Sequence, residues 1–135
     1  FFLRAFCFFS LVRVFGDCPL LTSGFESEKQ VDMYPSRTAA SEVYAQVETD
    51  IEEALRLMPA SSKLLHKASP AAINMLRTEY YLWKAKRLGG GNAALSTAQS
   101  SVDAVLKAGY ALLPTFADIF NLNNEANSEL IWTLP

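Results

Sequence analysis

The sequence predicts an all-α fold made of antiparallel helix pairs of the tetratricopeptide type, stacked into an α-α superhelix. Three observations lead to this prediction: helical spacing of apolar residues, glycine and proline stops between the periodic stretches, and two adjacent helices joined by a short glycine-rich link. Those two helices span about 40 residues, close to the tetratricopeptide unit of about 34. We expect helices at about 1–15, 39–58, 70–88 and 93–108, then an irregular tail over 110–135.

The first predicted helix is apolar on nearly every side. Six of the nine phenylalanines lie within residues 1–15, and Gly16 and Pro19 stop the helix. A helix of this composition has to be covered by other protein. A membrane span needs about 20 apolar residues, and this shorter run is interrupted by Arg4 and Arg13. Because the helix starts without Met or cap and "ELIWTLP" ends in a strand-like run, we expect residues 1–135 to be a single helical segment of a larger protein.

The stretch "LVRVFGDCPL" has some features of a lipoprotein export signal, with Cys18 as the lipid anchor. Asp17 stands directly before Cys18, where the signal needs a small residue, and the two arginines interrupt the apolar run. We therefore interpret the stretch as folded protein. In a helix Cys7 would lie about 12 Å along the axis from the helix end, too far for a disulfide with Cys18. Both cysteines are predicted to be small buried apolar residues.

The second predicted helix, 39–58, is amphipathic. Thr38 is the expected cap, and Pro59 follows the last turn. Its apolar residues recur with i, i+4, i+8 spacing on one side. Its acidic residues lie mainly on the other side and are predicted to form a solvated face: Glu48, Asp50, Glu52 and Glu53.

The next two helices carry the clearest boundary signals. Ser69 is the expected cap of helix 70–88, Pro70 occupies its first turn, and three glycines at 89–91 end it. Asn92 is the expected cap of helix 93–108, and Gly109 ends that helix. Small residues on its early apolar side would let the preceding helix approach closely.

The tail changes character after Gly109. Its apolar residues are predicted to plug the end of the helical stack: Tyr110, Leu112, Phe116, Ile119 and Phe120. The asparagine-rich stretch 121–127 is predicted to be a loop, and Glu129–Thr133 is a possible strand.

The sequence offers no catalytic, cofactor or metal site. The single histidine, His66, is predicted to lie at the surface, and residues 121–132 depart from a calcium loop at Ala126 and Trp132. A net charge of −2 without a basic stripe argues against nucleic-acid binding. A glycoside hydrolase would want paired carboxylates in a cleft, and the acidic residues here cluster on one helix. Stacks of this type usually present a surface to a partner, so a free-standing adaptor for another protein is one interpretation.

Four segments in order resemble the SusD/RagB family of nutrient-binding outer-membrane lipoproteins. They are "RAFCFFSLVRVFGDCPLLT", "SRTAASEVYAQVETDIEEALRLMP", "AAINMLRTEYYLWKAKRLGGGN" and "AGYALLPTFADIFNLNNEANSELIW". The resemblance implies a non-catalytic protein that captures a glycan or other nutrient and passes it to a TonB-dependent transporter of the SusC type. It also implies a surface-exposed place on the outer membrane, with a lipid anchor on a cysteine upstream of Phe1.

The resemblance carries over four residues, and it implies structural roles for all of them. Gly16 would permit the turn after the first helix, Pro19 would fix the exit of the chain, and Arg13 could pair with Asp17. Arg77 and Thr78 depart from the family, which often has small apolar residues at these positions, so we expect the packing around this helix to differ. No glycan-stacking aromatic of the family has a matching motif here, so the resemblance implies no ligand-contacting residue.

Overall fold

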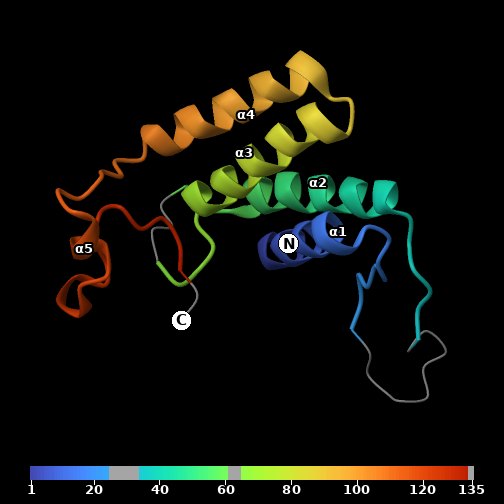
Figure 1. Cartoon of the computed structure of the whole chain (residues 1–135), viewed down its shortest axis with the longest axis horizontal. Helices are drawn as coiled ribbons and strands as arrows, with labels where there is room; N and C mark the ends of the chain where they lie inside the picture. The colour runs from blue at the N-terminus through green and yellow to red at the C-terminus, as the bar shows by residue number, and fades with distance from the viewer. Residues whose placement is uncertain (25–33, 61–64, 134–135) are drawn as a thin grey trace. The chain divides into compact units, whose positions relative to one another are not determined.

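The computed structural model describes residues 1–24, 34–60 and 65–133 (Figure 1). Within them lie α1 (Phe2–Phe15), α2 (Ala40–Leu57), α3 (Pro70–Arg87), α4 (Gly91–Leu106), the short α5 (Phe116–Ile119) and the 3-10 helix η2 (Leu122–Asn124). The four long helices begin and end within two residues of the predicted ranges. These described ranges contain helices and no strand, so the all-α prediction is confirmed.

The chain forms two compact units, Phe1–Asp50 and Ile51–Pro135. Helix α2 contributes its first turns to the first unit and its last turns to the second. None of the helices in the described ranges is both long and apolar enough to cross a membrane. The prediction that they form one segment of a larger protein stays a prediction.

Helix α1 buries one side and exposes the other. Its buried residues follow the helical period: Phe2, Ala5, Phe8, Phe9 and Val12. The opposite side keeps large apolar residues at the surface, among them Leu3 and Val14. The helix ends where Gly16 takes a φ of 67° and its N–H donates to the Val12 carbonyl at 3.0 Å. A side chain would strain that left-handed backbone, so glycine suits this turn.

The two cysteines differ in their surroundings. Cys18 is buried as predicted, whereas Cys7 is exposed, so the prediction that both are buried is wrong for Cys7. The helical period explains the difference, because Cys7 follows Leu3 by one turn on the exposed side of α1. Both thiols are free.

The segments before and after the connector of the first unit meet at the start of α2. The Thr38 N–H donates to the Cys18 carbonyl at 3.0 Å in an isolated antiparallel bridge. The Ala40 N–H donates to the Asp17 carboxylate at 2.8 Å. Asp17, distant in sequence, thus supplies the acceptor at this helix start that we predicted Thr38 would provide. The prediction for Thr38 is wrong because α2 begins at Ala40, which places Thr38 one residue before the cap position.

Helices α3 and α4 pack against each other as an antiparallel pair (Figure 1). The Ser69 hydroxyl accepts a hydrogen bond from the Ala72 N–H at 3.2 Å, and Pro70 begins α3, so both start signals are confirmed. Helix α4 begins earlier than predicted, with Gly90 as its N-cap, and this places Asn92 inside the first turn. The prediction that Asn92 is the cap is therefore wrong. The buried residues of α4 are small, apart from one valine, as a close helix pair requires: Ala94, Ala98, Ser101 and Val105.

The tail is held by bonds between side chains and backbone. The Ala111 N–H donates to the Ser128 carbonyl at 3.1 Å, and the Ser128 hydroxyl donates to the Ala111 carbonyl at 3.0 Å. The Leu113 N–H donates to the Glu129 carboxylate at 2.9 Å. The possible strand at Glu129–Thr133 is wrong, because this stretch has turn and irregular backbone and forms no ladder with any described residue.

The predicted plug is also wrong for most of its residues. Leu112, Phe116 and Phe120 are 84%, 77% and 68% exposed. Phe116 begins α5 and Phe120 directly follows its last residue, and the two rings contact each other edge to face with centroids 5.1 Å apart. Tyr110 and Ile119 are half-buried.

We expect the Asp17→Ala substitution to lower the free energy of unfolding by about 1 kcal/mol, because it removes the acceptor at the start of α2. Urea unfolding followed by circular dichroism measures the loss. Asp17→Asn is the matched control, since asparagine keeps an acceptor oxygen and caps nearly as well. Equal losses from the two substitutions would show that the charge, and not the cap, is what matters.

Candidate functional site

The four residues carried over from the family motif lie in the first unit. Gly16 turns the chain out of α1, and the carboxylate of Asp17 reaches the start of α2. The Arg13 guanidinium lies over the Phe9 ring, 4.1 Å from its centroid. Pro19 is exposed. An ion pair between Arg13 and Asp17 stays a prediction, as does the purely structural role of the motif.

A buried ion pair joins α1 and the first part of α2. The Arg4 guanidinium donates through Nε and Nη2 to the two oxygens of Asp50, at 2.7 and 2.6 Å. The Gln46 amide adds a third bond to Asp50 at 3.0 Å, and Arg4 also donates to the Thr22 carbonyl at 3.0 Å. The hydrogen bond to Asp50 raises the pKa of Arg4 above its ordinary value. This carboxylate is satisfied by fixed partners and is not available to a ligand.

The burial of Asp50 corrects the prediction of a fully solvated acidic face on α2. Asp50 is 0% exposed, and the other three acidic residues named for that face are half-buried. Glu53 fits the prediction better, because it pairs with Arg56 at the surface and this hydrogen bond lowers the pKa of Glu53. The helical period already places Asp50 on the buried side of α2, three residues after Val47 and four before Ala54. Only its partner Arg4, 46 residues away, could not be identified from the period.

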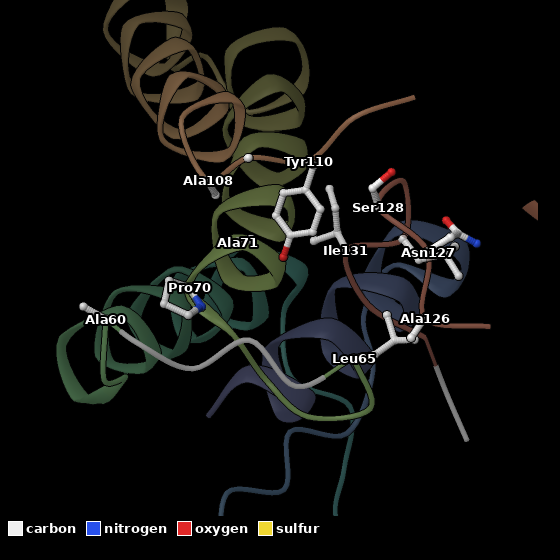
Figure 2. A pocket seen from close by; sticks show the side chains of 12 residues that line it. Ala60, Leu65, Pro70, Ala71, Ala108, Tyr110, Ala126, Asn127, Ser128 and Ile131 are labelled. Atoms are coloured by element: carbon white, nitrogen blue, oxygen red, sulfur yellow. The ribbon is translucent and has the colours of Figure 1, made fainter. Parts of the chain in front are cut away.

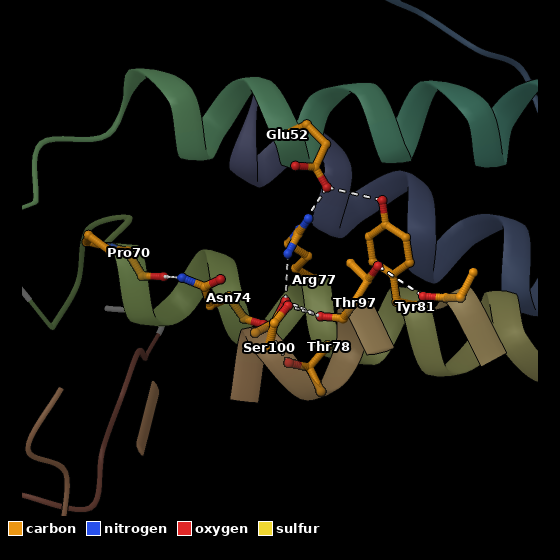
Figure 3. A network of polar contacts seen from close by, with 10 residues as sticks. Glu52, Pro70, Asn74, Arg77, Thr78, Tyr81, Thr97 and Ser100 are labelled. Atoms are coloured by element: carbon orange, nitrogen blue, oxygen red, sulfur yellow. Dashed lines mark hydrogen bonds and ion pairs between the residues drawn. The ribbon is translucent and has the colours of Figure 1, made fainter. Parts of the chain in front are cut away.

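A polar network in the second unit crosses three helices (Figure 3). Arg77 of α3 donates to the Glu52 carboxylate of α2 at 2.7 Å and to the Ser101 hydroxyl of α4 at 2.9 Å. The Tyr81 hydroxyl donates to the same Glu52 oxygen at 3.2 Å, and the Arg77 guanidinium lies 5.2 Å from the centroid of the Tyr81 ring. The departure from the family at Arg77 is thus a cross-helix contact. Its signal in the sequence was an arginine inside a mainly apolar helix.

His66 lies at the surface, as predicted, with Nδ1 3.1 Å from the Thr133 hydroxyl. Across residues 1–24, 34–60 and 65–133, no group of histidine, cysteine, aspartate and glutamate side chains could hold a metal ion.

The second unit contains a hollow of about 270 Å³, here called the Tyr110 hollow (Figure 2). Its described lining consists of Ala60, Leu65, 70–71, 108–110, 126–128 and 130–131. Figure 2 shows the Tyr110 ring between Ala71 of α3 and Ile131 of the tail. The described lining carries apolar side chains, hydroxyls and one amide, and none of it is charged.

A second hollow, of about 300 Å³ and here called the apolar hollow, shares part of this lining. It is bounded by Met75, Val102, 105–106, 110–112, Glu129 and Ile131. Tyr110 and Ile131 line both hollows and so form the wall between them. The sequence indicated Tyr110 only as a plug residue, because its role depends on the tail folding back toward α3.

We expect Asp50→Asn to destabilise the protein by about 2 kcal/mol, because it removes the charge from the buried acceptor of two hydrogen bonds that the half-buried Arg4 guanidinium donates. Urea unfolding at neutral pH measures the change. Glu53→Gln is the control on the same helix, and because Glu53 belongs to a surface pair, this substitution should change the free energy of unfolding much less. Similar costs for both variants would contradict the burial of the Arg4–Asp50 pair.

We expect Arg77→Met to cost about 1 kcal/mol of unfolding free energy. Methionine keeps much of the apolar stem and loses the bonds to Glu52 and Ser101. Lys86→Met, at an exposed position of the same helix, is the matched control and should change the stability little. Thermal unfolding of both variants measures the difference, and a stable Arg77→Met protein would contradict a stabilising role for the network.

Comparison with known proteins gives concordant matches. Residues 1–82 match the SusD-like family model described as "Starch-binding associating with outer membrane". SusD-like proteins P25 and P2 of Formosa agariphila are each 27% identical to this chain, over 98% and 93% of its length. The chain spans 24% of the length of each of these relatives.

Solved structures give the same result. B. fragilis NanU superposes with a TM-score of 0.88 at 28% identity, over 98% of this chain and 26% of that protein. A SusD-like protein from Bacteroides fragilis NCTC 9343 superposes with a TM-score of 0.74 at 25% identity, over 97% of this chain and 25% of that protein. The family model covers more than half of the chain, and the relatives and structures agree with it. The chain therefore belongs to the SusD-like family.

Proposed function

We propose that this chain is part of the helical scaffold of a non-catalytic nutrient-binding protein of the outer membrane. In this proposal the whole protein captures a glycan at the cell surface and hands it to a TonB-dependent transporter barrel. A lipid on a cysteine upstream of Phe1 anchors it to the membrane. The observation that carries the proposal is the match of residues 1–82 to a family described as starch-binding and associated with the outer membrane.

The disposition of the acidic side chains supports binding without catalysis. Glycoside hydrolysis requires two carboxylates that flank a substrate, one of them free to give and take a proton. In α2, Asp50 is held by Arg4 and Gln46, and Glu52 is held by Arg77 and Tyr81. These carboxylates serve to connect helices.

The transporter partnership and the anchor are tested on the full-length protein, tagged at its C-terminus and purified from detergent-solubilised outer membranes. We expect a TonB-dependent barrel to co-purify in stoichiometric amount, as measured by quantitative mass spectrometry. Labelling with radioactive palmitate should mark the native protein. A tagged, unrelated outer-membrane lipoprotein serves as the control for nonspecific capture.

A soluble, unlabelled protein that purifies without a barrel would contradict the proposal and would favour the free-standing adaptor. Loss of the barrel with retention of the lipid label would contradict the transporter partnership alone.

A further inference from the structure

We propose that the Tyr110 hollow is a subsite for one neutral sugar ring, in which the ring stacks on Tyr110. The inference rests on the proposed function of glycan capture and assigns part of that capture to this chain. It is carried by three features of the hollow: its size, its uncharged described lining, and the hydrogen-bonded backbone beside Tyr110, the one aromatic residue of that described lining.

The size suits one ring. Ligand pockets begin at roughly 300 Å³, and this hollow of about 270 Å³ lies at that lower limit. A longer oligosaccharide would extend out of the hollow, which is open to solvent along the exposed residues Ala126 and Ser128.

The chemistry of the lining suits a neutral, amphipathic ligand. A sugar ring has an apolar face of C–H groups and an edge of hydroxyls, and Tyr110 has an apolar ring with a polar tip. Figure 2 shows the Tyr110 hydroxyl directed into the hollow. The Ser128 hydroxyl donates its proton to the Ala111 carbonyl, so its oxygen can still accept from a sugar hydroxyl. The described lining offers no charged side chain to pair with an acidic or basic sugar.

The backbone on both sides of Tyr110 is held in place before any ligand arrives. Gly109 has a φ of 85° and turns the chain after α4, so that Tyr110 begins the tail. The next residue, Ala111, is fixed by two hydrogen bonds to Ser128, and Leu113 is fixed by Glu129. Asn127 is buried and donates to the carbonyls of Ile119 and Asn124, which holds the wall opposite. A site positioned in this way loses little conformational freedom when a ligand binds.

The test begins with the purified full-length protein on an array of neutral and acidic oligosaccharides. The strongest neutral binder is then measured by isothermal titration calorimetry against four variants. Tyr110→Ala should weaken binding about tenfold, since aromatic packing contributes about 1 kcal/mol or more. Tyr110→Phe, which keeps the ring and loses only the hydroxyl, should weaken it about threefold. Ala126→Phe fills the hollow from an exposed position and should weaken binding at least tenfold. Tyr34→Ala is the matched control, because Tyr34 is 91% exposed and lies outside the lining.

Each result decides the subsite separately from the proposed function. Neutral glycan binding that Tyr110→Ala and Ala126→Phe leave unchanged would overturn the subsite and leave glycan capture intact. Binding of acidic glycans alone would overturn the neutral class. A protein that binds no glycan on the array but still co-purifies with the barrel would overturn glycan capture and the subsite, and would retain the transporter partnership. If Tyr110→Ala fails to fold, as judged by its thermal midpoint, Tyr110→Phe and Ala126→Phe decide the question.

Discussion

The buried carboxylate of Asp50 sets the strongest physical constraint on this chain. An ionised group without access to water is stable only when charged or polar partners surround it. Arg4 donates two hydrogen bonds to Asp50, and Gln46 donates a third. Arg4 also donates to the Thr22 carbonyl. The register of α1 along the start of α2 is therefore fixed, because a shift by one residue would separate the charges.

In the second unit, too, an arginine forms an ion pair with a carboxylate of another helix, and this carboxylate is more accessible to solvent. Arg77 connects Glu52 of α2 to Ser101 of α4 while remaining on α3, so one guanidinium fixes three helices. Guanidinium is suited to this role, because its planar fork of donors can serve two acceptors at once. Small residues on the buried side of α4 then let it approach α3 closely. In both units, apolar burial supplies the driving force and an arginine supplies the register.

The tail shows how side chains can replace a regular element. Ser128 and Glu129 use their side-chain oxygens on the backbone of 111–113, and Asn127 closes the loop over 119–124. The result is an irregular but well-bonded segment that places Tyr110 beside α3 and leaves two hollows on either side of it. The matched relatives are about four times longer than this chain, and the tail is the segment in which we propose a ligand subsite. The helices themselves offer satisfied charges and close packing.

The sequence by itself determined the helices and some of their caps. Apolar periodicity, Ser69 with Pro70, and the glycine stops are local signals, because the residues that interact lie within about a turn of each other. Tertiary structure decided which side chains meet. Asp17 replaces Thr38 at the start of α2, and Arg4 becomes the partner of Asp50. Neither the absence of the possible strand nor the position of Tyr110 could be derived locally. Each depends on a partner distant in sequence, and such partners are chosen by how the chain packs, which no short pattern encodes.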